Sequence, residues 1–398
     1  MRMLLASGLG RLTSRFALES LIASAVRNTQ CPLQGPVVIS GLFRTASGIG
    51  ESARICSKAL QTLGIQHTNV DLSTNFNQID IKAEHPVEAM PSALSGVLLL
   101  HFNAPETVHA LTALRMMWPR RWHIIGNWVW ELDGEPLGWR TASKFISEIW
   151  TPSEYSREAL LKATNKRVTV VPYFVRSQQP QKLDRAKYGI EQNEFLVLSM
   201  ADARSSLHRK NLIGSINVFR NAFGARQGFR LILKTRNLRE DTAIGRMIFS
   251  AAREDSRITV IDRSIISSEV MELIDCCDVY LSLHRAEGFG LTMAEAMALG
   301  KAVIATGWSG NMEYMSNRSA ALVSYSLVPA LDKSGIYNPT VGTRWAEPDE
   351  AEASRLLALL AESPAERNRL GEAARDAINE KLSAKSYANA LTKRLKMN

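Results

Sequence analysis

Short apolar segments alternate with segments of helical periodicity along most of the chain. The apolar segments of the first half, which we predict to be strands, are residues 36–43, 67–72, 96–102, 122–132, 148–153 and 166–175. Those of the second half are residues 194–200, 229–235, 257–262, 278–284 and 301–306. Strands that are separated by helices predict right-handed βαβ units, and such units build parallel sheets.

Helices are predicted between these strands. After the first strand, Ala53, Cys56, Leu60 and Leu63 recur at the spacing of one helix face. In the second half the helical segments are residues 211–223, 238–253, 268–276 and 290–299. The C-terminal segment 363–395 has helical character throughout, and we expect it to pack across both halves.

The alternation stops at residues 176–193, where the chain is polar and lacks extended apolar periodicity. We interpret this segment as an interdomain link, because 398 residues exceed what a single core usually supports. The predicted fold class is therefore α/β, with two Rossmann-like, doubly wound parallel-sheet domains and a cleft between them. The first domain is expected at residues 36–180 and the second at 190–375, after a basic leader at 1–35.

The composition is that of a soluble globular protein, with 45% hydrophobic and 22% charged residues. No apolar run approaches the roughly 20 residues that span a bilayer. The apolar N-terminus is interrupted by Gly8, Gly10, Arg11 and Arg15, which disfavours a signal peptide. The four cysteines (Cys31, Cys56, Cys276 and Cys277) have no metal-ligand spacing. We therefore expect inert thiols in a reducing, cytoplasmic compartment.

The net charge of +9 predicts attraction to polyanions. Nucleic acid is disfavoured as a partner, because the sequence has no zinc knuckle, basic heptad region or RNP-type aromatic run. Anionic lipid headgroups and phosphorylated small molecules remain. Leu5, Leu9, Leu12 and Phe16 fall on one stripe of a helix, so residues 3–16 either lie on an anionic membrane surface or form a loosely packed basic leader.

The strongest candidate site is the strand–loop–helix junction at 282–306. Gly288 and Gly290 let the backbone approach a ligand, and the helix that begins near Leu291 presents free N–H groups to a phosphate. Glu295, one turn into that helix, is placed to accept hydrogen bonds from ribose hydroxyls. Glu287, at the strand end, would face the group beyond the phosphates. The alternative is that both carboxylates only solvate a helix N-terminus.

A second junction follows the strand at 194–200. Arg204, Arg209 and Lys210 gather there, and cations of this kind complement a diphosphate. The alternative is a loop of solvated charges. Two junctions with complementary chemistry in the same domain favour a nucleotide site over either alternative.

Three further signals are weaker. Gly41, Gly48 and Gly50 open a helix, but their spacing is not G-x-G-x-x-G. His101 ends a strand, where α/β sheets place functional groups, although such a histidine is more often structural. Glu131 stands beside Trp128 and Trp130, which predicts either a sugar-stacking platform or core aromatics. The sequence has no D-x-D motif and no His/Cys/Asp cluster, so no metal site is predicted.

Several ordered blocks resemble the retaining glycosyltransferases of family 4, in a bacterial polysaccharide and lipopolysaccharide branch. "HRAEGFGLTMAEAMALGKAVIATGWSGNMEYM" resembles the E-x7-E signature, and "DARSSLHRKN" the phosphate-binding segment. "GLFRTASGIGESARICSKAL" is similar to the N-terminal glycine loop, and "GNWVWELDGEPLGWRTASKFISEIWTPSEYSREAL" to the W-E-L…EIW-x-PS block. "LVPALDKSGIYNPTVGTRWAEPD" matches a further C-terminal block, so the resemblance covers residues 36–390.

The resemblance implies the GT-B architecture, with a C-terminal helix at 376–398 that crosses back to the first domain. It implies that Lys210 with Arg204 or Arg209 binds the donor diphosphate and that Glu295 holds the ribose. Glu287 and His101 would act at the reacting sugar, and Glu131 would lie on the acceptor side. The donor loop is completed by Gly288, Phe289, Gly290 and Leu291, and closed from the first domain by Gly48 and Gly50.

The predicted function is a metal-independent, retaining transfer of a hexosyl-type sugar from a UDP- or GDP-linked donor to a glycan or lipid-linked acceptor. No cofactor is expected, because the nucleotide-sugar is a co-substrate. The expected place of action is the cytoplasm, at the inner membrane face if the leader binds lipid. Two alternatives remain, a GT-B sugar-nucleotide epimerase and a non-catalytic protein that binds nucleotide-sugar or glycan.

Overall fold

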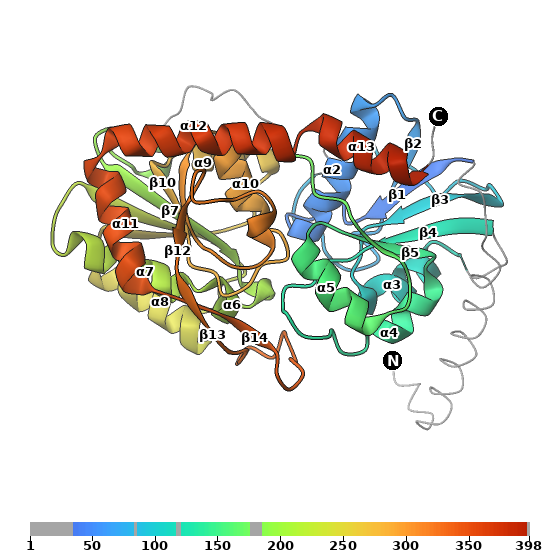
Figure 1. Cartoon of the computed structure of the whole chain (residues 1–398), viewed down its shortest axis with the longest axis horizontal. Coiled ribbons are helices and arrows are strands. Elements are labelled where there is room, and N and C mark those ends of the chain that lie inside the picture. Colours follow the sequence, from blue (N-terminus) through green and yellow to red (C-terminus); the bar gives the residue numbers. More distant parts are fainter. Residues whose placement is uncertain (1–34, 83–85, 117–120, 176–184, 396–398) are drawn as a thin grey trace, which may run out of the picture.

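Each half of the chain contains a parallel β-sheet of six strands. The computed structural model describes residues 35–82, 86–116, 121–175 and 185–395. The two sheets and their helices lie side by side, and the C-terminal helices run along both (Figure 1). This architecture confirms the predicted α/β class with two doubly wound domains. The leader and the first part of the predicted link, residues 176–184, lie outside the described residues.

The sheet of the first domain has the strand order β2-β1-β3-β4-β5-β6. Its strands are β1 (Val37–Gly41), β2 (His67–Asp71), β3 (Ser95–Leu100), β4 (Arg121–Asn127), β5 (Glu148–Thr151) and β6 (Val168–Val170). Its helices are α2 (Gly48–Thr62), α3 (Ala104–Ala113), α4 (Trp139–Ala142) and α5 (Glu154–Ala163). All five strand pairs are parallel. Every residue of β1 and of β5 is buried, as helices on both faces of a sheet require.

The sheet of the second domain has the order β12-β11-β10-β7-β8-β9. Its strands are β7 (Phe195–Asp202), β8 (Phe229–Arg236), β9 (Ile258–Asp262), β10 (Val279–Ser282), β11 (Ala302–Thr306) and β12 (Ala321–Val323). Its helices are α6 (Leu207–Lys210), α7 (Leu212–Phe223), α8 (Ala243–Glu254), α9 (Ser267–Cys276) and α10 (Leu291–Ala298). The order reverses between β10 and β7, and ligands of open α/β sheets bind at such a point.

The two longest apolar predictions of the first half were too long. Residues 128–132 form a loop after β4, and residues 171–175 follow β6 without strand structure. Trp128 and Trp130 are both buried and pack edge-on against Trp139. The apolar run therefore reflects core packing of a loop, and both indoles belong to the core.

An antiparallel hairpin in the second domain escaped the sequence analysis. It consists of β13 (Tyr325–Pro329) and β14 (Arg344–Pro348), joined by residues 330–343. β13 has no buried residue, so its sequence lacks the apolar run by which the other strands were found. In Figure 1 the hairpin extends below the second sheet toward the first domain.

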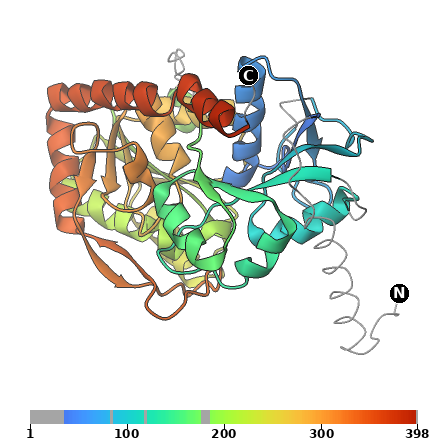
Figure 2. The same cartoon turned by 45° about the vertical axis from the view of Figure 1, so that its right-hand side comes forward.

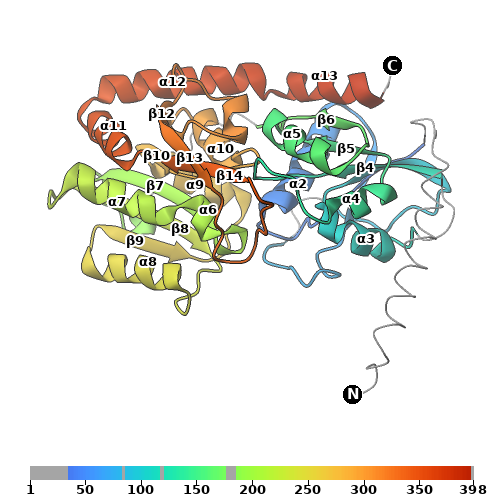
Figure 3. The same ribbon diagram turned by 60° about the horizontal axis from the view of Figure 1, so that its bottom comes forward.

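The C-terminal segment is not one continuous helix. After α11 (Glu350–Glu362), α12 (Pro364–Lys381) ends at Leu382, and α13 (Ala384–Leu395) begins after Ser383. Leu370, Ala374 and Ile378 of α12 are buried in the second domain. Figures 2 and 3 show α13 lying beyond α12 and over the first domain. Position 376 therefore lies inside α12, and the crossing segment starts at Ala384.

Helix α13 joins the core of the first domain through Tyr387 and Leu391. Both side chains are buried and belong to the apolar cluster that contains Ala53 and Cys56 of α2. Burial of two large side chains contributes about 1.5–3 kcal/mol each, so this contact ties the chain end to the first domain.

Candidate functional site

The loop that follows β10 carries Glu287 and is held in place by the segment after β11. The Glu287 N–H donates to the Ser309 hydroxyl (2.8 Å), and the Gly310 N–H donates to the Glu287 carbonyl (2.9 Å). The Tyr314 hydroxyl lies 3.0 Å from the Phe289 carbonyl and 2.7 Å from that of Gly290. The buried polar groups of this loop therefore have partners, which makes it a rigid support for a side chain.

Two cations converge on the Glu287 carboxylate. Lys210 Nζ lies 2.5 Å from one carboxylate oxygen, and Arg209 Nη1 lies 3.2 Å from the other. Burial alone would raise the pKa of Glu287, but Lys210 and Arg209 together lower this pKa to about 2. Glu287 is therefore ionised at every pH at which the protein is folded, and its charge is balanced by both cations.

Arg209 is buried to the point where its donors are committed. Its side chain is 1% exposed, Nη1 donates to the Ala286 carbonyl (2.6 Å), and Nη2 donates to the Ser205 hydroxyl (2.6 Å). Lys210 is 22% exposed, and Arg204 is exposed with no ion-pair partner among the described residues. The structure thus brings Arg209 and Lys210 together at Glu287, and it leaves Lys210 as the more accessible cation of the two.

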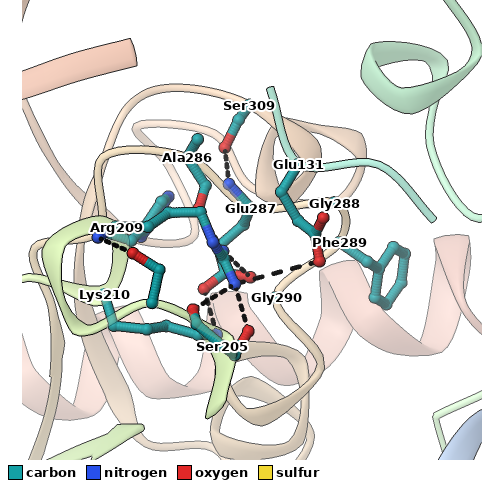
Figure 4. Close-up of polar contacts among 12 residues, drawn as sticks. Glu131, Ser205, Arg209, Lys210, Ala286, Glu287, Gly288, Phe289, Gly290 and Ser309 are labelled. Atoms are coloured by element: carbon teal, nitrogen blue, oxygen red, sulfur yellow. Dashed lines mark hydrogen bonds and ion pairs between the residues drawn. The ribbon is translucent and has the colours of Figure 1, made fainter. Parts of the chain in front are cut away.

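Glu131 reaches this cluster from the first domain. It lies in the loop after β4, and its carboxylate is 4.0 Å from Arg209 Nη2. Figure 4 shows Arg209 between Glu131 on one side and Glu287 on the other. Burial raises the pKa of Glu131, and Arg209 opposes that shift. One guanidinium therefore serves carboxylates from both domains.

Glu295 occupies a different environment. It lies on α10 opposite helix α2 of the first domain, and its pKa is raised to about 8 by burial and then by the charge of Glu51, with Arg54 opposing. Glu51 itself accepts hydrogen bonds from Arg54 Nε (2.8 Å) and from the Ser267 hydroxyl (2.9 Å). Helix α10 begins after Gly290, which has a φ of 82°, and no described side chain caps it. Its first N–H groups are thus available to an anion.

The remaining predicted residues line the first-domain side. His101 is buried, its Nδ1 lies 2.9 Å from the Ser52 hydroxyl, and burial lowers its pKa to about 3. His101 Nε2 has no hydrogen-bond partner among the described residues. A Cβ on Gly50 would lie 2.6 Å from two backbone carbonyls, whereas one on Gly48 would meet nothing within 4 Å. Gly50 is thus required by packing, and Gly48 faces open space.

Phe289 is buried, and Leu291 is half-buried. The Phe289 ring stacks edge-on with Tyr173 at 5.0 Å between ring centroids. Gly288 touches the first domain directly, because a Cβ there would lie 2.2 Å from Val129 Cγ1. The donor loop of the second domain is thus in contact with the loop that carries Glu131.

Sequence reasoning missed three contributors. Tyr337, from residues 330–343, places its ring 5.6 Å from the Arg209 guanidinium. The Ser153 hydroxyl donates to the Gly288 carbonyl (2.6 Å), and Tyr173 packs on Phe289. Ser153 and Tyr337 both lie in blocks that carried the family resemblance, which was the available signal. Their roles depend on contacts between domains, and no local pattern encodes these.

Within the described ranges, no group of three or more His, Cys, Asp or Glu side chains is placed to hold a metal ion. Cys56, Cys276 and Cys277 are buried and form no disulfide, whereas Cys31 lies outside the described residues. No described helix is long and apolar enough to cross a membrane. The predicted membrane-surface helix at 3–16 also lies outside the described residues.

Comparison with known proteins places this geometry in a wider context. Residues 255–329 match the family model described as Glycosyl transferases group 1, a span that includes the Glu287 loop and α10. No curated protein matches the sequence.

Solved structures share the fold at low sequence identity. The Anabaena Alr3699/HepE complex with UDP and glucose has a TM-score of 0.64 and 12% identity, over 91% of this chain and 100% of that chain. Sucrose-phosphate synthase from Thermosynechococcus elongatus has a TM-score of 0.64 and 15% identity, over 91% and 98%. S. aureus TarM, in complex with UDP among other ligands, has a TM-score of 0.55 and 13% identity over 77% of this chain, which spans only 57% of TarM. The chain therefore has the GT-B fold.

Proposed function

We propose that this protein is a metal-independent, retaining glycosyltransferase that moves a sugar from a UDP- or GDP-linked donor to a hydroxyl group of a glycan or lipid-linked acceptor. The observation that supports it most is the convergence of Lys210 and Arg209 on Glu287. They meet beside the uncapped N-terminus of α10, at the edge of the sheet where the strand order reverses. The match to the group 1 family model covers that edge.

Donor binding would rearrange the charges of this cluster. Without ligand, Lys210 is neutralised by Glu287. A diphosphate carries more negative charge than one carboxylate, so it would attract Lys210 and the N–H groups at the start of α10. Glu287 would then accept hydrogen bonds from the hydroxyls of the donor sugar, and Glu295 from those of the ribose.

The same groups stabilise the departing nucleotide. In the proposed reaction the bond between C1 of the sugar and the phosphate oxygen breaks, and a bond from the acceptor oxygen to C1 forms on the same face. The acceptor proton passes to the leaving phosphate, which accepts it as its charge develops. Lys210 and the dipole of α10 stabilise that charge in a site that excludes much of the solvent.

A donor screen by calorimetry tests the proposal. UDP-, GDP-, ADP- and CMP-sugars are titrated in EDTA into the wild type, Lys210→Ala and Glu295→Ala. Lys187→Ala serves as the control, because Lys187 forms a surface ion pair with Glu272 in the same domain. We expect one nucleotide-sugar to bind, and to bind at least about tenfold more weakly to the first two variants, the loss of one charged hydrogen bond. Equal binding to Lys210→Ala, or no binding by the wild type, contradicts the proposed donor site.

Product analysis then separates the reaction classes. Incubation of the bound donor without an acceptor should release nucleoside diphosphate and free sugar slowly, with water as the acceptor. An epimerised nucleotide-sugar would instead identify an epimerase. Tight binding with no product of either kind would identify a binding protein.

A further inference from the structure

The hairpin β13–β14 adds an element that the two six-stranded sheets do not require. Its connecting residues 330–343, here called the insert, begin where the match to the family model ends at residue 329. Although the hairpin belongs to the second domain by sequence, Ala330, Tyr337 and Trp345 are buried in the apolar cluster of the first domain. The hairpin therefore reaches from one domain into the core of the other.

Both ends of the insert are fixed. On the second-domain side, the Ser206 hydroxyl donates to Asp332 (2.7 Å), and Asp332 also accepts the Tyr337 N–H (2.9 Å). On the first-domain side, the Arg344 N–H donates to the Asp133 carboxylate (2.7 Å), and a Cβ on Gly134 would lie 1.9 Å from Thr343 Oγ1. These contacts hold the insert directly beside the loop that carries Glu131.

Tyr337 connects the insert to the charged cluster. Its side chain is buried, with its ring 5.5 Å from the Trp130 ring and 5.6 Å from the Arg209 guanidinium. A hydrogen bond between the Tyr337 and Glu131 side chains lowers the pKa of Glu131, against the effect of burial. Removing that hydroxyl changes the surroundings of Glu131 while the ring can stay in place.

Glu131 has acceptor capacity left over. A carboxylate offers about four lone-pair sites, whereas Glu131 has one hydrogen bond from Tyr337 and one long ion pair of 4.0 Å with Arg209. Its side chain is 19% exposed, against 8% for Glu287, which two cations neutralise. Of these two carboxylates, Glu131 is the one that can bind an incoming hydroxyl group.

We propose that Tyr337 is a positioning residue that fixes Glu131 to bind the attacking hydroxyl of the acceptor, so that the insert determines which acceptors are used. This inference rests on the proposed glycosyltransferase function. The ligand class is a hydroxylated acceptor such as a sugar or polyol. Water and glycerol are the simplest members of this class and serve as probes.

The experiment compares Tyr337→Phe with the wild type. Tyr325→Phe is the matched control, because it removes a hydroxyl from β13 of the same hairpin at a side chain that is 37% exposed. The donor found by calorimetry is supplied, and release of nucleoside diphosphate is followed against glycerol concentration and pH. Thermal unfolding and the affinity for the nucleoside diphosphate are measured for each variant.

For Tyr337→Phe we expect an affinity for the nucleoside diphosphate within about twofold of the wild type and a glycerol KM about tenfold higher, the loss of one charged hydrogen bond. The acid limb of the rate profile should move to higher pH, because the lost hydrogen bond held the pKa of Glu131 down. The other charged or titratable groups that act on Glu131 are unchanged in this variant: Arg209 and Lys210 of α6, Glu287, Tyr155 of α5 and Tyr173. Tyr325→Phe should match the wild type in all four measurements.

Two results would overturn the inference while leaving the proposed function intact. One is a Tyr337→Phe variant that equals the wild type in glycerol KM and in its pH profile. The other is a variant that loses nucleotide affinity and transfer in the same proportion, which would place Tyr337 in the donor site or the fold. If the wild type binds the donor but neither hydrolyses nor transfers it, the proposed function fails, and the acceptor site falls with it.

Discussion

The hydroxyl of Ser153 donates a hydrogen bond to the carbonyl of Gly288, 2.6 Å away and 135 positions later in the chain. Ser153 also caps α5, because its hydroxyl accepts the Ser156 N–H at 3.1 Å. Helix α5 of the first domain is thereby anchored to the loop that carries Glu287. The Glu313 carboxylate, which accepts the Glu154 N–H at 2.5 Å, adds a second bond from the second domain to the start of the same helix.

Replacement of Ser153 by Ala should measure this anchor. The variant loses the cap and leaves a buried carbonyl without a partner, so the free energy of unfolding should fall by about 2–4 kcal/mol. Ser47→Ala is the matched control, because Ser47 caps α2 in the same way through the Gly50 N–H and has no bond to the second domain. Denaturant unfolding gives both values. Equal losses would show that the interdomain bond contributes nothing.

Arg209 should matter more for stability than its neighbour Arg204. Arg209→Met leaves Glu131 and part of the Glu287 charge uncompensated in a buried setting, and we expect a loss of about 3–5 kcal/mol. Arg204 is exposed, so Arg204→Met should change stability by less than about 0.5 kcal/mol. Adding Glu131→Gln to Arg209→Met should restore part of the loss. No restoration would mean that the two residues are not coupled.

Glu295 should make the protein less stable at alkaline pH. Its pKa in the folded chain is about 8, above its ordinary value of 4.5, so the folded state holds this proton more tightly than the unfolded state does. The resulting stabilisation is present below pH 4.5 and is lost as pH rises toward 8. Glu295→Gln should therefore raise the Tm by several degrees at pH 8.5 and leave it nearly unchanged at pH 4.5.

Thermal unfolding at the two pH values checks this expectation. Glu372→Gln on α12 is the control, because Glu372 is exposed and the same substitution there should have no pH-dependent effect. An identical change in Tm at both pH values for Glu295→Gln would contradict the assigned environment of this carboxyl group.

Gly288 should tolerate no side chain while Val129 is present. A Cβ at position 288 would lie 2.2 Å from Val129 Cγ1, so Gly288→Ala must push the two domains apart or move the donor loop. We expect a lower Tm and at least about tenfold weaker nucleotide binding, because a shift of about 1 Å in a binding loop has effects of that order. Val129→Ala removes the clashing methyl group, and the double variant should recover much of both losses.

Gly310→Ala provides the contrast. Its Cβ would lie 2.2 Å from the carbonyl oxygen of Gly288, and backbone cannot yield as a side chain can. Val129→Ala should therefore give no recovery in the Gly310→Ala background. Recovery there would show that the loop moves as freely as a side chain.

The amino-acid sequence by itself determined the two sheets, because strands buried on both faces must be apolar along their length and β1, β5 and β11 leave an unmistakable pattern. It also indicated where Lys210 and Glu287 lie, since each follows a strand, and the carboxyl ends of parallel strands share one edge of the sheet. The hairpin β13–β14 was not predicted, because β13 buries no residue and carries no apolar run.

Only the tertiary structure decided which groups meet. It made Arg209, and not Arg204, the partner of Glu287, because the fold of α6 turns one guanidinium inward and leaves the other exposed. It placed Glu131 and Tyr337 at the same guanidinium, although more than 200 residues separate them. It divided the C-terminal helical segment at Leu382, since each part packs on a different domain. Contacts of this kind arise from how the two domains dock, and no local sequence pattern records docking.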